Sequence, residues 1–265
     1  MKKVKKCLFT LCGGLVLINL PIRFAQAQIN LFSIQDEIKL GQQVARQVES
    51  DPKNRILDEK QYPEAYRHLR RITNTILNSG QVRYRNEFPW QVKIIHNDSI
   101  LNAFCAPGGF IYVYTGIIKF LDTEDQFAGV LAHEIAHADR RHATTNLTRM
   151  YGIAALTEII LGKNPNRLVQ IAQGLLGLQF SRNHERDADN QSVLYLCHTH
   201  YAPNGAAGFF EKMLQRRSAE PPAFLSTHPA SSDRIRDINA AASTMNCPSK
   251  QGDKNYQAFK ASLPR

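Results

Sequence analysis

The stretch 130–142 contains two histidines four residues apart, His133 and His137, with Glu134 directly after the first. In a helix, side chains at this spacing lie on one face, with roughly 6 Å between their Cβ atoms. Two imidazole nitrogens can then bind one small cation, and the Glu134 carboxylate can contact a water on it. This HExxH pattern is typical of zinc sites in which the glutamate is a general base. The alternative is a buried amphipathic helix with surface histidines.

A zinc ion held by two histidines needs a third protein ligand and an open position for water. Glu185 and Asp189 are four residues apart on a helix predicted further along the chain, so they share a face. One carboxylate can bind the metal while the other accepts the N–H of a ligating histidine and fixes its tautomer. An exposed charge run is the alternative, since Arg182 and Arg186 can pair with these carboxylates.

The elements before the HExxH stretch are two helices and a small sheet of three or four strands. Apolar periodicity predicts helices at 34–48, capped by 33–36, and at 63–77, and strands at 91–95, 101–105 and 110–114, with a hairpin turn at 106–109. Residues 123–126 are predicted to cap the long helix that carries the HExxH residues.

The elements after it are mainly helical. Residues 144–179 predict two helices joined at 162–165, and these can be core helices, a mobile cover over the cleft or a membrane-facing surface. Further helices are predicted at 183–197, 204–217 and 231–242, with Ser226 to Pro229 in a loop and a weakly specified tail at 249–265. His142 is expected to be structural, turned away from the metal face and bonded to an acidic partner. His184, His198 and His200 are expected on helix surfaces.

The first 27 residues have the pattern of a cleavable export signal. Residues 1–6 carry four lysines, 7–20 carry no charge, and 25–27 supply small residues at the cleavage positions. An uncleaved membrane anchor is the alternative, but an apolar run of 14 residues is short for a span of about 20. We therefore expect a periplasmic or otherwise exported chain in which residues 28–248 form one catalytic domain.

Cleavage after Ala27 removes five basic and no acidic residues, so the formal net charge falls from +10 to +5. The remaining basic residues are scattered between acidic ones, which does not favour nucleic-acid binding. Weak attraction to anionic membrane surfaces stays open. Of the remaining cysteines, Cys197 and Cys247 can pair in an oxidising compartment and leave Cys105 free, but the sequence leaves this pairing open.

Four separated motifs in this order resemble those of the HtpX-like/CAAX-prenyl-protease family of zinc endopeptidases. The resemblance covers about residues 33–240 and points to the exported, soluble bacterial branch. Its motifs are the sheet element 102–109, His133-Glu134-x-x-His137-x-x-x-Arg141-His142, Ser181-Arg-x-x-Glu185-x-x-Ala188-Asp189, and Thr227-His228-Pro229 ending in Arg234-Ile235. Ser192 follows the Ala188-Asp189 pair at a position where many relatives carry glycine, so the chain departs from the family pattern there.

The resemblance implies a gluzincin-type fold, α+β and mainly α, with a small sheet beside the HExxH helix and one zinc ion per chain. It implies that His133, His137 and Glu185 are zinc ligands and that Glu134 is the base. It also implies that Asp189 orients a ligating histidine. His228 would lie near the metal, where it either donates to the oxyanion or binds the metal in a resting state.

The expected function is zinc-dependent hydrolysis of peptide bonds in misfolded or envelope proteins. An exported chaperone or assembly factor with a largely resting zinc site is the alternative, and an intact Glu134 disfavours a noncatalytic scaffold. Unfolded or flexible substrates would pair with an edge strand, for which we predict Phe110, Ile111, Tyr112, Val113 and Tyr114, although this strand also suits the interior. The natural substrate, cleavage preference and oligomeric state stay open.

Overall fold

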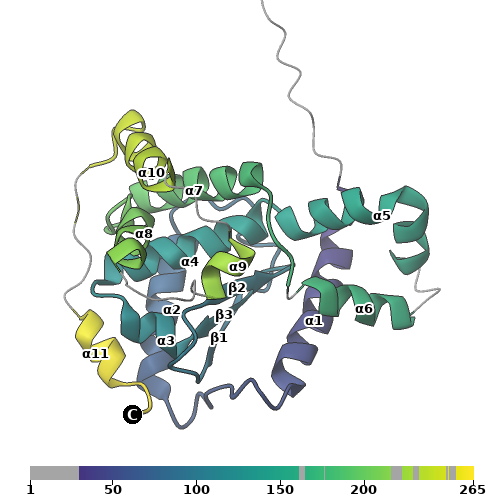
Figure 1. Ribbon diagram of the computed structural model, residues 1–265, viewed down its shortest axis with the longest axis horizontal. Helices are drawn as coiled ribbons and strands as arrows, with labels where there is room; N and C mark the ends of the chain where they lie inside the picture. The colour runs from purple at the N-terminus through teal and green to yellow at the C-terminus, as the bar shows by residue number, and fades with distance from the viewer. Residues whose placement is uncertain are drawn as a thin grey trace, which may run out of the picture.

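The computed structural model describes residues 30–160, 165–175, 177–215, 223–228, 233–248, 250 and 255–265, without the side chains of 153–160 and 165–168. The predicted export signal lies outside these residues. The helices are α1 (Ile34–Ser50), α2 (Pro63–Leu77), α3 (Thr115–Phe120), α4 (Glu124–Asp139), α5 (His142–Ile160), α6 (Pro165–Leu175), α7 (Arg182–Cys197), α8 (Gly205–Gln215), α9 (Ala223–Thr227), α10 (Asp233–Thr244) and α11 (Tyr256–Ala261), and the strands are β1 (Gln91–Ile95), β2 (Ala103–Ala106) and β3 (Phe110–Tyr114). This mainly helical architecture with a small sheet confirms the predicted fold class (Figure 1).

The sheet has the strand order β1-β3-β2, with β3 parallel to β1 and antiparallel to β2. β2 and β3 form the predicted hairpin through a turn in which Gly108 and Gly109 have φ values of 75° and 85°. These left-handed conformations favour glycine. A Cβ atom on Gly109 would lie 2.8 Å from the Trp90 ring, so the tight turn also depends on the missing side chain.

The prediction that residues 110–114 form an edge strand for substrate is wrong. β3 pairs with β1 along one side and with β2 along the other, so its backbone groups are used within the sheet. Its side chains from Phe110 to Val113 are buried. β2 is the strand of the described sheet that lies at an edge and packs beside α4.

α4 begins with the predicted capping box. The Thr123 side chain accepts from the backbone of Gln126, and the Gln126 side chain accepts from the backbone of Thr123, which satisfies amides that have no partner within the helix. The helix is buried from Phe127 to Asp139. It ends at Asp139, because Arg141 adopts a φ of 58° and the chain turns into α5 at His142.

α4 crosses the centre of the molecule and the other elements pack around it (Figure 1). α7 and α8 lie against it, and α10 packs on both of them. Gly129 of α4 and Gly205 of α8 allow a close approach, because a Cβ atom on Gly129 would lie 2.1 Å from the backbone nitrogen of Ala206. The main hydrophobic core therefore forms between α4, α2, the sheet, α7 and α8.

α1 and the α5–α6 pair form a second part of the molecule, at the right of Figure 1. α6 packs along α1, and a smaller hydrophobic cluster joins them to the sheet. The prediction of two helices within 144–179 is confirmed, with a kink in α5 at Gly152, where φ is 70°. In the part of the chain that the structure describes, none of the helices is both long and apolar enough to span a bilayer.

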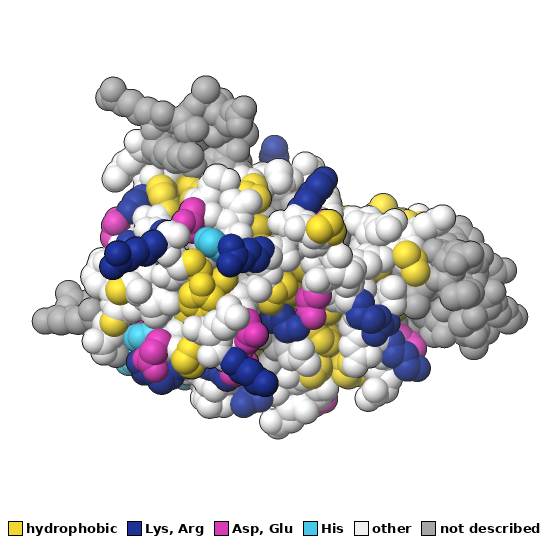
Figure 2. Space-filling model, turned by 90° about the horizontal axis from the view of Figure 1, so that it is seen from below, with side chains coloured by type: hydrophobic (Ala, Val, Ile, Leu, Met, Phe, Trp, Pro, Cys, Tyr) yellow, Lys and Arg dark blue, Asp and Glu magenta, His cyan; other side chains and the backbone are white. Residues whose placement is uncertain are grey.

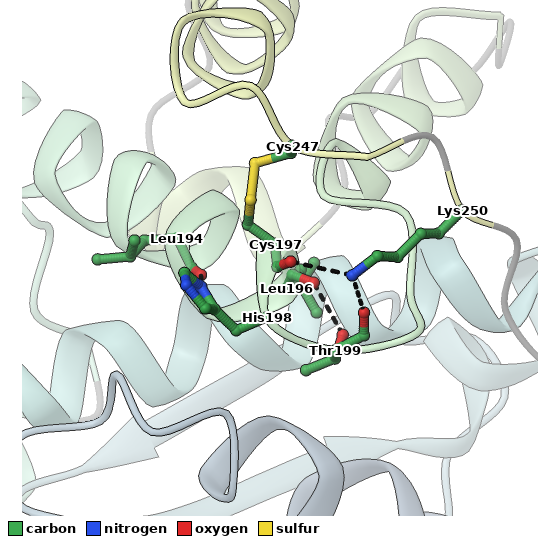
Figure 3. The surroundings of a disulfide bond; sticks show 7 residues. All are labelled: Leu194, Leu196, Cys197, His198, Thr199, Cys247 and Lys250. Atoms are coloured by element: carbon green, nitrogen blue, oxygen red, sulfur yellow. Dashed lines mark hydrogen bonds between the residues drawn. A yellow bond between two sulfur atoms is a disulfide. The ribbon is translucent and has the colours of Figure 1, made fainter.

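A disulfide joins the end of α7 to the segment after α10 (Figure 3). Cys197 and Cys247 have Cα atoms 5.2 Å apart and are bonded, while Cys105 is free, as the sequence allowed. The Lys250 ammonium donates to the backbone oxygen of Cys197 at 3.0 Å and to that of Thr199. These contacts fasten the C-terminal segment to α7.

The prediction of a weakly specified tail at 249–265 is wrong for its described end. α11 buries Tyr256 and Phe259 in the main core, and Leu263 follows them. The Phe259 ring lies 5.5 Å from the ring of Phe127 on α4. The last helix is therefore part of the packed domain.

Charged side chains of both signs are interspersed on the face seen in Figure 2, with hydrophobic side chains between them. Among the described residues, basic side chains pair with acidic ones, such as Arg67 with Glu64 at 2.6 Å and Lys93 with Glu49 at 2.6 Å. The positive charge on this face is therefore distributed, not gathered in one patch.

Candidate metal centre

Four side chains converge between α4, α7 and the end of α9: His133, His137, Glu185 and His228. One ligand atom from each lies within 4.8 Å of the others, and all four residues are buried. α4 supplies the two histidines of the HExxH motif and α7 supplies Glu185. His228 directly follows α9, with its backbone N–H donating to Phe224 at 3.0 Å. The structure thus brings together the three predicted ligands and His228.

The spacing and chemistry of these atoms fit a zinc ion. His133 Nε2 lies 3.0 Å from His137 Nε2, and each nitrogen lies 3.4 Å from an oxygen of Glu185. Ligand atoms of a tetrahedral zinc site with bonds of 2.0–2.1 Å are roughly 3.3 Å apart. Two imidazoles and a carboxylate are also a donor set of catalytic zinc sites, which keep a further position open.

The surroundings favour the protonation states that bind metal for two of these residues. Burial alone would raise the pKa of the Glu185 carboxyl, but contacts with three imidazoles hold its pKa well below the usual range. Burial holds the pKa of His137 well below its usual value. Burial would also lower the pKa of His133, but Asp189 and Glu185 raise it to about 9. Metal binding must therefore displace a proton from His133.

Glu134 lies beside this cluster and is fully buried. Its carboxylate faces the backbone of Cys105 and the ring of His228, whose Nε2 lies 3.3 Å from Oε1. Burial raises the pKa of its carboxyl. A fully buried carboxylate is costly for stability and calls for a functional reason, which a water-activating base would supply.

Asp189 lies behind His133, with Oδ1 2.9 Å from His133 Nδ1. This is the arrangement expected of a carboxylate that orients a ligating imidazole. The buried Arg234 of α10 donates to both oxygens of Asp189, at 2.6 and 2.8 Å, and lies 3.0 Å from Glu185 Oε2. Sequence reasoning singled out Arg234 within a motif but gave it no role. The structure shows that it links two acidic residues of the centre.

His142 contacts the back of His137, contrary to the expectation that it turns away from the metal face. Its Nδ1 lies 3.0 Å from His137 Nδ1, and its Nε2 lies 3.0 Å from Asp187 Oδ2. The acidic partner was predicted correctly. The contact with His137 arises because the chain turns at Arg141, so His142 is not on the same helix as His137.

Two more rings pack on this histidine group, and sequence reasoning missed both. His184 is buried, not at a helix surface as predicted, and stacks on His142 with ring centroids 4.4 Å apart. Phe180 stacks on His137 at 4.0 Å. Phe180 lies just before the charged first half of α7. Its own hydrophobic side chain is the only signal in the sequence that this position is buried.

Comparison with known proteins identifies similarity over most of the chain. The profile described as Peptidase family M48 matches residues 63–242. The mitochondrial metalloendopeptidase OMA1 of Schizosaccharomyces pombe is 32% identical over 219 residues, which is 80% of this chain and 62% of that protein. The beta-barrel assembly-enhancing protease of Escherichia coli K12 is 29% identical over 188 residues, or 65% of this chain and 38% of that protein.

A third relative, the OMA1 metalloendopeptidase of Arabidopsis thaliana, is 34% identical over 148 residues, covering 56% of this chain and 30% of that protein. The chain thus spans between about a third and less than two thirds of the length of these relatives. The region that the family profile matches, residues 63–242, includes α4, α7, His228 and most of α10, and so all the residues of the candidate centre.

Proposed function

This chain belongs to peptidase family M48, and on that premise we propose that it is a zinc-dependent endopeptidase. In this proposal His133, His137 and Glu185 hold the zinc ion, and Asp189 orients His133. Glu134 is the general base. The observation that carries the proposal is the meeting of zinc-ligand atoms beside the fully buried carboxylate of Glu134.

The protein's own groups would carry the proton transfers of hydrolysis. When bound, zinc acts as a Lewis acid that polarises the scissile carbonyl and makes water more acidic. Glu134 takes the proton of the attacking water and then hands it to the leaving amine. The pKa of its carboxyl, raised by burial, makes it a better base. His228 Nε2 is near enough to this reaction to donate to the developing oxyanion.

An extended substrate would pair with β2. This strand has an edge that no described strand covers, and it packs beside α4. Backbone pairing at a sheet edge does not depend on side-chain identity, but it requires an extended chain. This favours unfolded or flexible proteins as substrates.

Misfolded or envelope proteins are the proposed substrates in an exported setting. One relative is named a beta-barrel assembly-enhancing protease, which supports a role in the envelope. The Cys197–Cys247 disulfide supports an oxidising compartment, because disulfides persist mainly outside the cytosol. The pattern of an export signal at residues 1–27 supports the same location.

One observation favours a second candidate function. His228 Nδ1 lies 3.3 Å from His133 Nε2 and 3.1 Å from Glu185 Oε1, so His228 can also occupy a ligand position. If His228 binds the metal, the zinc site is inactive. The protein would then act by binding other proteins, as a chaperone or assembly factor. The two functions differ in whether a flexible substrate is cut.

The test is cleavage of casein by the zinc-loaded protein and by Glu134→Gln. The amide keeps the size of the side chain but cannot take a proton, so we expect normal zinc content and folding with a rate at least about 100-fold lower. Quantified fragments and zinc analysis report the outcome. A Glu134→Gln protein that cuts casein at the normal rate contradicts the assignment, and a wild-type protein that binds casein without cutting it supports the second function.

A further inference from the structure

A small cavity lies directly beside Glu134 and His228, and most of its wall is apolar. Its volume is about 20 Å³. The apolar lining comes from separate parts of the chain: Val44 of α1, Phe104 of β2, Ala143 of α5, Leu175 at the end of α6, and Leu178 and Phe180 between α6 and α7. Cys105, Ala106, Pro107 and Thr227 complete the lining.

The cavity is fixed to the candidate centre by direct contacts. The Phe180 ring stacks on His137 at 4.0 Å and lies 5.6 Å from the ring of His228. The backbone N–H of Phe180 donates to the oxygen of Thr227 at 3.2 Å. The wall around Phe180 is therefore held next to the residues that perform the proposed chemistry.

We propose that this cavity receives the substrate side chain next to the scissile bond and selects small apolar residues. The inference rests on the proposed peptidase function and adds a cleavage preference to it. Glu134 acts on the water that attacks the scissile carbon, so a side chain flanking that bond lies within reach of a cavity that Glu134 itself lines.

The lining and the volume decide which side chains enter. A charged side chain would give up hydration against Val44, Phe104 and Leu178, and this costs free energy without a buried partner. A volume of about 20 Å³ has room for little more than one water-sized group. The methyl group of alanine fits, whereas a phenylalanine ring has to displace Leu175 or Leu178.

The first experiment measures cleavage by the zinc-loaded full chain of a peptide mixture that varies both residues flanking a central bond. Mass spectrometry maps the cut sites and gives relative kcat/KM values. We expect alanine to be enriched at one flanking position, with phenylalanine, aspartate and lysine each disfavoured there by about 10-fold or more, the range that hydrophobic pockets achieve for small size differences.

Two substitutions of Leu178 then change the cavity in opposite ways. Leu178→Ala enlarges it, so the preference should move to larger apolar residues such as leucine and phenylalanine. Leu178→Arg places a cation in the wall, so the preference should move to aspartate and glutamate. Gln179→Arg is the matched control, because Gln179 is exposed and does not line the cavity, and it should keep the wild-type preference.

The outcomes separate the two proposals. A wild-type protein that cuts no peptide overturns the proposed function and this inference with it. Cleavage without a preference at either flanking position, or with lysine favoured through attraction to Glu134, overturns the cavity assignment and leaves the peptidase function in place. A cleavage preference that is unchanged in Leu178→Ala also overturns the cavity assignment. If Leu178→Arg does not fold, Leu178→Ala alone tests that assignment.

Discussion

The buried carboxylates of the centre are fully balanced when both a metal and Arg234 are present. Glu134, Glu185 and Asp189 contribute three formal negative charges in a region of very low exposure. A zinc dication and the Arg234 guanidinium contribute three positive charges. Because an unpaired charge in a protein interior is very unfavourable, Arg234 is expected to support the metal site through Asp189 and Glu185.

Arg234→Gln should therefore weaken zinc binding. The amide cannot reproduce the two parallel hydrogen bonds to Asp189 or the positive charge, and loss of an outer partner of a metal ligand lowers affinity by about 10–100-fold. Arg234→Lys keeps the charge but not the fork geometry, so it should fall between wild type and Arg234→Gln. Competition with a chromophoric chelator measures the dissociation constants.

Arg236→Gln is the control for this experiment. Arg236 lies on the same helix, but its side chain is 70% exposed and pairs with Asp233 and Asp237, so zinc affinity should not change. Equal zinc affinity in Arg234→Gln and wild type, with both proteins folded by circular dichroism, would show that Arg234 does not support the metal site.

For individual residues, spacing and family resemblance predicted which side chains form the metal centre, but not which other side chains contact them. His133 and His137 follow from helical periodicity, and Glu185, Asp189 and His228 follow from the resemblance. The contact of His142 with His137 depends on a left-handed backbone at Arg141. Arginine is not a usual residue for that conformation, so the sequence carried no signal for it.

At the scale of elements, the distance between α4 and α8 depends on residues without side chains. Gly129→Ala would place a methyl group 2.1 Å from the backbone nitrogen of Ala206, and backbone cannot rotate away as a side chain can. We expect a loss of about 1–3 kcal/mol or more in the free energy of unfolding. Urea denaturation of the zinc-loaded protein measures it.

Gly174→Ala is the matched control in α6. A Cβ atom there meets nothing within 4 Å among the described residues, and alanine is the better helix former by about 1 kcal/mol. This variant should be as stable as wild type or more stable. If Gly129→Ala were equally well tolerated, α8 would have to move away from α4 without cost, contrary to the close packing described above.

The helices and strands themselves were largely predictable, and the errors have identifiable causes. Alternation predicts the β2–β3 hairpin, but not that β1 joins it in parallel along β3, because that pairing depends on long-range packing. α11 was missed since its polar composition obscured Tyr256, Phe259 and Leu263, which are spaced three and four residues apart. That spacing is the helical signal that could have identified it.

For the whole molecule, zinc would tie α4 to α7 and should contribute to thermal stability. Removal of zinc with a chelator leaves the three buried carboxylates with Arg234 and a protonated His133 for compensation, and it removes the link between α4 and α7. A ligand present at 1,000 times its dissociation constant stabilises by about 4 kcal/mol, so we expect a fall in Tm of about 10 °C for a domain of this size.

Differential scanning fluorimetry with and without the chelator measures this fall, and adding zinc back should reverse it. Magnesium added in its place should not, because it prefers oxygen ligands in an octahedral arrangement. A Tm that is the same with and without the chelator would mean that the centre binds no structural metal.

The Cys197–Cys247 bond closes a covalent ring in the chain, with 50 positions separating its two cysteines. His228 and Arg234 are inside this ring, while Glu185 and Asp189 precede it on the helix that ends at Cys197. If another copy of the enzyme nicks the backbone once within the ring, the two pieces stay attached. Such a molecule should migrate as one band in a gel without thiol and as two bands after reduction, and it should keep its activity until the reductant is added.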